Sequence, residues 1–191
     1  MGIGSLRDLY LDELFDVYDA EAQASRACAR LTDSARAPAL RGALARLAQE
    51  SRLHLERLQL ILTHWGEPVR ICRCRAVEAI VQQADDRVHA AKTPAICDAS
   101  ILAAIRRIEY YEMAVYNCAQ TSARQLNRMD DARLLQESLD DEERALQRFT
   151  DIAEAPAKDE GRSTESPLES REDAGQWGAS GAAASTIGRP R

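Results

Sequence analysis

Two carboxylates, those of Glu109 and Glu112, interrupt a stripe of residues that is apolar at both ends. Read in steps of three and four, the stripe consists of Leu102, Ile105, Glu109, Glu112, Tyr116, Ala119, Ala123 and Leu126. That spacing places every member on one face of an α-helix. Taking an ionised carboxylate out of water costs several kcal/mol unless a partner compensates the charge. An acid pair on a packed seam therefore indicates a bound cation or a retained proton.

Three other apolar stripes carry polar residues at their midpoints. Each has an apolar residue every three or four positions on both sides of its polar members, which are Glu21 within 6–31, Glu50 and His54 within 40–65, and Glu142 within 132–149. A helix bundle that turns several carboxylates and an imidazole toward its centre has the side chains of a metal site. The chemistry expected of these residues is therefore metal binding.

These polar residues require long helices whose centres meet. Gly and Pro are sparse before residue 155, where Ala, Leu, Arg and Glu dominate and favour helices. We predict helices over Ser5–Thr32, Pro38–Trp65, Ala76–Ala91, Pro94–Leu126 and Asp130–Ala153. Short loops between long helices make antiparallel hairpins, and the shorter helix returns the chain to the far end. The expected fold is all-α: a ferritin-like antiparallel four-helix bundle with a short crossover helix between its second and third helices.

The polar residues also lie at matching heights. At 1.5 Å per residue, the five acids fall roughly 17–24 Å from the turns that join their helices. Antiparallel pairing then brings all of them to one level of the bundle. We predict one metal site formed by Glu21, Glu50, His54, Glu109, Glu112 and Glu142.

Charge favours two metal ions in this site. Five carboxylates packed together cannot all ionise unaided, because some would take up protons. Two divalent ions would bring four positive charges and nearly cancel the five negative ones. A carboxylate-rich site with one imidazole suits iron or manganese better than copper or zinc. The expected cofactor is therefore two iron or manganese ions per chain, with Tyr18 and Tyr116 as hydrogen-bond donors beside the ligands. No catalytic residue is predicted beyond the ligands themselves.

Composition excludes several classes of protein. The net charge of −6, with acids and bases interspersed, argues against a nucleic-acid partner. No apolar run approaches the roughly 20 residues of a membrane span, and no signal-peptide core follows the N-terminus. Five irregularly spaced cysteines fit a reducing cytoplasm better than a disulfide framework. Residues 155–191 are rich in Gly, Ser and Ala, so we expect a disordered tail after a domain spanning 1–154.

Several segments of the chain are similar to one protein family. They are DVYDAEAQ (16–23), ESRLHLERL (50–58), RCRAVEAIV (73–81), AAIRRIEYYEMAVY (103–116) and LLQESLDDEE (134–143). Together they resemble the YciE/YciF family, also called DUF892, of ferritin-like proteins over residues 5–154. The resemblance implies a four-helix ferritin-like fold, homodimerisation, a di-iron site and a link to bacterial stress responses. It places the family's acids on Glu21, Glu50, Glu109, Glu112 and Glu142, while members vary at His54.

The chain departs from that pattern in its last helix. Leu146 stands where the family often has an acid, and the helix has no His, whereas typical ferritin-like sites have a second Glu-x-x-His pair. One metal position is therefore expected to be weak or empty. Simpler interpretations also stay open: a seam glutamate can reach solvent along its own stem, and His54 can be a hydrogen-bonded core residue. Asp141 and Glu143 are expected to be solvated.

Two functions of different classes fit these observations. In the first, the protein is a di-metal oxidoreductase or iron-handling protein that oxidises Fe(II) or removes a small-molecule oxidant. In the second, it is a non-catalytic helical homodimer, a structural or interaction module whose metal site has degenerated. Leu146 favours the second, and the convergence of acids on four helices favours the first. The sequence leaves open whether the protein is an enzyme.

Overall fold

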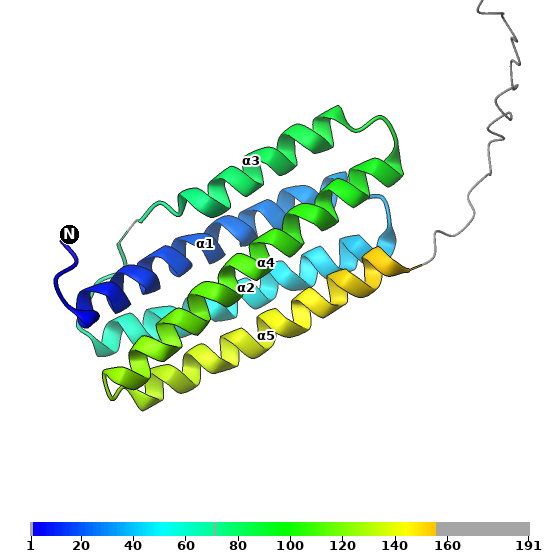
Figure 1. The fold of residues 1–191 in the computed structure, drawn as a ribbon. Helices are drawn as coiled ribbons and strands as arrows, with labels where there is room; N and C mark the ends of the chain where they lie inside the picture. The colour runs from blue at the N-terminus through cyan, green and yellow to red at the C-terminus, as the bar shows by residue number, and fades with distance from the viewer. Residues whose placement is uncertain (1, 71, 156–191) are drawn as a thin grey trace, which may run out of the picture. The chain divides into compact units, whose positions relative to one another are not determined.

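The computed structural model describes residues 2–70 and 72–155 of the chain. Within these residues the chain forms five helices and no strand (Figure 1). The helices are α1 (Leu6–Ser34), α2 (Pro38–His64), α3 (Arg75–Ala90), α4 (Pro94–Gln125) and α5 (Met129–Glu154). The all-α class is confirmed, and each boundary lies within two residues of the predicted one. The disorder expected for 155–191 falls, except for Ala155, outside the described residues.

Local signals explain where the helices begin and end. The Ser5 hydroxyl caps α1 by accepting from the Asp8 N–H at 3.1 Å, and Thr93 caps α4 in the same way. Side-chain oxygens at this position satisfy N–H groups that the helix itself leaves unpaired. Between α4 and α5, Asn127 takes a positive φ of 57°, a conformation that Asn tolerates better than most residues and that turns the chain sharply.

The four long helices pack side by side, and α3 lies along α1 and α4 (Figure 1). α1 contacts α2 and α4, while α5 contacts α4 and α2. The links between α1 and α2 and between α4 and α5 are only a few residues long, so each pair must run antiparallel. None of the helices in the described part of the chain is both long and apolar enough to cross a membrane.

At each end of the bundle, an aspartate side chain joins neighbouring helices or turns. At one end, Asp98 accepts the Arg36 and Ala37 backbone N–H groups at 2.8 Å each, which joins the α1–α2 turn to α4. At the other end, Asp131 is buried and accepts from Trp65 Nε1 at 2.8 Å and from the Tyr10 hydroxyl at 3.4 Å. These bonds fix how far each helix slides along its neighbour, and so they set the heights of residues at the helix centres.

The apolar core is divided into two parts. One part lies toward the α1–α2 turn and includes Leu44, Ile105 and Phe149, whereas the other lies toward the α4–α5 turn and includes Leu14, Ile61 and Leu135. The division falls at the midpoint of all four long helices, where apolar stripe positions give way to polar residues. A packed bundle therefore holds a buried polar layer between two apolar halves.

Candidate metal centre

Five of the six predicted ligands lie together in this layer. Glu21 comes from α1, His54 from α2, Glu109 and Glu112 from α4, and Glu142 from α5, and each is at most 1% exposed. Their ligand atoms form two groups, within each of which all atoms lie within 4.8 Å of one another. The groups are Glu21–His54–Glu142 and Glu109–Glu112–Glu142. Glu142 belongs to both, as a carboxylate that bridges two ions would.

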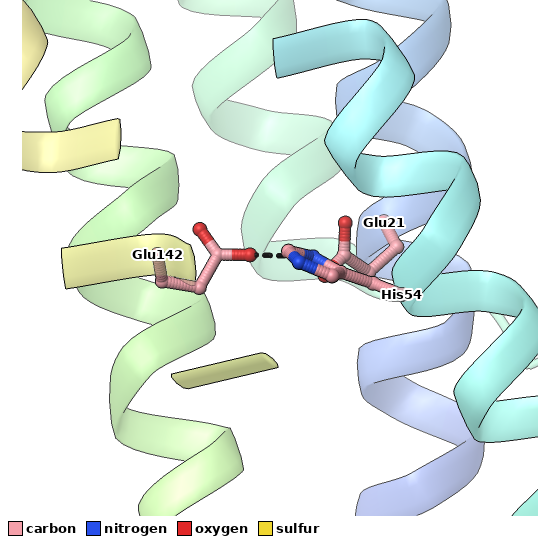
Figure 2. A group of neighbouring side chains, drawn as sticks. All are labelled: Glu21, His54 and Glu142. Carbon is pink, nitrogen blue, oxygen red and sulfur yellow. Dashed lines mark hydrogen bonds and ion pairs between the residues drawn. The ribbon is translucent and has the colours of Figure 1, made fainter. Parts of the chain in front are cut away.

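The first group is centred on one imidazole nitrogen. His54 Nδ1 lies 2.8 Å from Glu21 Oε1 and 2.9 Å from Glu142 Oε1, with the imidazole between the two carboxylates (Figure 2). A ring nitrogen carries at most one hydrogen, so it can donate to only one of these oxygens at a time. The other carboxylate oxygen then receives no proton from His54. A divalent ion in place of the proton would satisfy both.

The second group consists of acids without partners. Both oxygens of Glu109 and Oε1 of Glu112 are buried and accept no hydrogen bond within the described residues. Native proteins rarely leave buried carboxylate oxygens unpaired, and such atoms indicate a strained site or a missing ion. Three converging carboxylates provide the oxygen ligands that hard divalent cations prefer. The donor set of the two groups together, four carboxylates and one imidazole, fits iron or manganese.

The layer shifts the protonation of its own members. Burial, followed by the Glu142 charge, raises the pKa of Glu109 well above its usual value. Burial, with the Glu21 and Glu142 charges, does the same to the pKa of Glu112. Burial and the Glu21 charge raise the pKa of Glu142 to about 7, although its contact with His54 opposes that rise. Without a metal ion, the layer therefore holds protons near neutral pH.

Glu21 and His54 form the charged pair of the layer. Burial disfavours both charged forms, but the Glu21 carboxylate and hydrogen bonds with Glu142 and Glu21 raise the pKa of His54 to about 11. Burial alone would raise the pKa of Glu21, but the His54 charge, together with hydrogen bonds from His54, Tyr116 and Ser51, lowers it. The predicted donor Tyr116 is confirmed, because its hydroxyl donates to Glu21 Oε1 at 2.7 Å.

Asp141 corrects one expectation from the sequence. It is half-buried rather than solvated: Oδ2 accepts from Arg57 Nη1 at 2.7 Å and lies 3.4 Å from His54 Nε2. A carboxylate on the far ring nitrogen orients a histidine ligand and favours the tautomer that leaves the near nitrogen free. Asp141 precedes Glu142, so its side chain points about 100° away from that of Glu142 around the helix axis. Its contact with α2 therefore could not be predicted from the sequence of α5.

Glu50 lies outside both groups. Its side chain is 15% exposed and forms ion pairs with Arg46 and Arg148. Three residues before His54, the buried position on the seam is held by Ser51 instead. Ferritin-like di-metal proteins use a Glu-x-x-His pair at this spacing, so α2 brings a histidine into the layer without the accompanying acid.

The fold and the layer together define a class: an all-helical protein with a buried carboxylate and histidine cluster at its centre. A family described as a domain of unknown function, DUF892, matches residues 5–161, and the chain belongs to that family. Protein YciF of Escherichia coli (strain K12) is 29% identical over 154 residues, which cover 80% of this chain and 93% of that protein.

Two solved structures resemble the fold. The crystal structure of the stress protein YciF from E. coli matches with a TM-score of 0.76 at 28% identity, covering 79% of this chain and 96% of that one. YcfI from Rhodopseudomonas palustris, to which a structural role is provisionally ascribed, matches with a TM-score of 0.75 at 27% identity. That match covers 78% of this chain and 94% of YcfI.

Proposed function

We propose that this chain is a ferritin-like protein that binds a carboxylate-bridged pair of iron or manganese ions. In this proposal α1, α2, α4 and α5 are the four helices of the ferritin-like bundle, and α3 is the crossover. The observation that carries the proposal is the buried Glu142, which is shared by two ligand groups and lies beside carboxylate oxygens without partners. An acid layer of this kind is costly in a core unless cations compensate it.

Each residue of the layer has a role in holding such a pair. Glu21 and His54 would bind one ion, Glu109 and Glu112 the other, and Glu142 both. The Tyr116 hydroxyl orients Glu21, and Asp141 orients His54. The apolar halves of the core pack above and below the layer.

A bound pair of iron or manganese ions would supply the redox chemistry, which is oxidation of Fe(II) or removal of a small-molecule oxidant. The relative described as a stress protein fits a role of this kind. Free cysteines in the described residues, such as the buried Cys28, fit a reducing cytoplasm, where we place the protein. The protein is an enzyme if the bound ions repeatedly oxidise Fe(II) or remove an oxidant.

Metal binding can be measured directly on purified full-length protein. Calorimetric titration with Mn(II), and with Fe(II) under anaerobic conditions, should saturate at about two ions per chain, as expected for two ligand groups. At least one ion should remain after desalting, and exposure to air should then oxidise bound Fe(II) faster than free Fe(II). Protein that stays metal-free after anaerobic loading would rule out the proposed function.

A second function is favoured by one relative and by two departures from the family pattern in α5. The provisional structural role ascribed to YcfI, together with Leu146 and the absence of a histidine from α5, fits a helical module with a degenerate metal site. In that case the layer would keep its protons and no ion would bind. The titration above separates the two functions.

Either function is compatible with a homodimer, which we also propose. The resemblance to the YciE/YciF family implies a dimer rather than a large shell. Light scattering should give twice the mass of one chain. A particle of several hundred kilodaltons would contradict this assembly.

A further inference from the structure

Glu50 is close to the metal layer but is held away from it. It precedes His54 by four residues of α2, about 6 Å along the helix axis. Its two carboxylate oxygens are both engaged: Oε1 accepts from Arg46 Nε at 2.9 Å, and Oε2 accepts from Arg148 Nη2. Glu50 is therefore a predicted ligand that lies on α2, close to the height of the metal layer, but is ion-paired with two arginines.

Of the two arginines, Arg148 is the one that faces the layer. Arg46 lies on the same helix as Glu50, and its side chain is 61% exposed. Arg148 comes from α5, is 23% exposed, and has a buried Nε without a hydrogen-bond partner in the described residues. Burial and the Glu142 charge raise the pKa of Glu109, and the Arg148 guanidinium partly offsets that rise. Arg148 thus acts on Glu50 and on Glu109, a member of the second ligand group.

The two ligand groups are unequal as a result. Glu21–His54–Glu142 combines carboxylates with an imidazole from α2, whereas Glu109–Glu112–Glu142 receives nothing from that helix. A positive charge close to Glu109 also lowers the attraction of that group for a second cation. Glu50 is the predicted ligand of α2 that neither group contains, and it is held by Arg148, the same residue that acts on Glu109.

We propose that Arg148 is a latch that withholds Glu50 from the second metal position. The Glu21–His54–Glu142 position then binds an ion tightly, and the Glu109–Glu112–Glu142 position binds weakly while the latch is closed. Release of Glu50 from Arg148 converts the weak position into a tight one. The inference rests on the proposed metal binding and adds to it an order of filling and the residue that sets it.

The test compares Mn(II) titrations of full-length wild type and Arg148→Met, which keeps most of the arginine stem. Wild type should show one tight and one weaker ion, separated by roughly tenfold or more in Kd, about 1.4 kcal/mol. Arg148→Met should tighten the second ion by a similar factor and leave the first unchanged. Arg46→Met is the matched control, because it removes the exposed arginine that also pairs with Glu50, and should behave like wild type.

A third variant separates ligation by Glu50 from the simple loss of a positive charge. Arg148→Met combined with Glu50→Asp keeps the negative charge but shortens its reach by one methylene, so tight second binding should be lost again. Anomalous scattering from Mn(II)-loaded Arg148→Met crystals should place Glu50 within bonding distance of the second ion. If Arg148→Met does not fold, Arg148→Gln is measured in the same way.

Four results would overturn the latch. Two equally tight ions in wild type would do so while leaving the proposed function intact. Tightening that persists with Asp at position 50 would show a charge effect alone, and an unchanged second Kd in Arg148→Met would show that the ion pair only joins α2 to α5. Wild type that binds no ion at all would remove the proposed function together with the latch.

Discussion

Replacing Glu109 with leucine should stabilise the metal-free protein while abolishing binding of the second ion. Glu109 is fully buried and neither of its oxygens has a hydrogen-bond partner among the described residues. The metal-free fold therefore carries this carboxyl at a cost, protonated or repelled by Glu142. Exchanging buried ionic groups for well-packed apolar ones has gained about 1–4 kcal/mol in other proteins, and a similar gain is expected here. Chemical denaturation in the presence of a chelator measures it.

The same variant should lose the stabilisation that comes from the second ion. A ligand stabilises only the state that binds it, so the rise in Tm at high Mn(II) concentration should be smaller in Glu109→Leu than in the wild type, and the part due to the Glu21–His54–Glu142 position should remain. Glu143→Leu is the matched control, because Glu143 is exposed on α5 beside the layer. It should change stability by less than about 0.5 kcal/mol and keep metal uptake. A Glu109→Leu protein that is destabilised and still binds two ions would remove Glu109 from the site.

Metal-free protein should lose stability as pH rises from about 5 to 8. The pKa of Glu142 is raised from 4.5 to about 7 in the folded state. A group with a raised pKa contributes stability below its unfolded pKa, and this contribution is lost as pH rises through the folded value. At 1.36 kcal/mol per unit, a shift of 2.5 units is a loss on the order of 3 kcal/mol.

The other buried groups act in the same direction over this range. Glu109 and Glu112 have raised pKa values and so lose stability with rising pH as Glu142 does. The pKa of His54, raised to about 11, extends the loss above pH 6.5. The lowered pKa of Glu21 has the opposite sign, but its contribution is lost only as pH falls below about 4.5.

Metal should reverse this pH profile. Ligands must lose their protons to bind an ion, so stabilisation by Mn(II) should be small at pH 5 and grow toward pH 8. Thermal melts with and without Mn(II) across this range give both curves. In Glu142→Gln the metal-free profile should be flatter, which isolates the layer from the general effect of net charge. A wild-type Tm that is independent of pH without metal would contradict the protonated layer.

The periodicity of apolar residues determined the helices of this protein. Steps of three and four residues located all five helices, since burial of one face requires that spacing wherever a helix packs. The same periodicity located Glu21, Glu109, Glu112 and Glu142, because each lies in line with large apolar neighbours on both sides. A polar residue in such a position has no path to solvent once the stripe packs.

Only the tertiary structure separated Glu50 from its neighbour Ser51. Both fit a helical stripe through His54, one at four residues and the other at three, and the two positions are about 100° apart around the helix. Which of them is buried depends on the direction in which α5 crosses α2 and on Arg148, which pairs with Glu50 at the edge. The spacing of residues within one helix predicts neither the crossing of α5 over α2 nor the ion pair between Arg148 and Glu50.

The contacts around the layer were likewise decided by packing. Asp141 lies beside His54 because α2 and α5 run antiparallel with His54 opposite Glu142, a register that the Asp131 and Asp98 bonds at the bundle ends hold in place. A helix pattern predicts which face is buried, but not how far one helix is shifted along another. The sequence by itself thus determined that acids meet at the centre of a bundle. The tertiary structure decided which carboxylates lie together in each ligand group and which acid is held by arginine, because these depend on distances between helices.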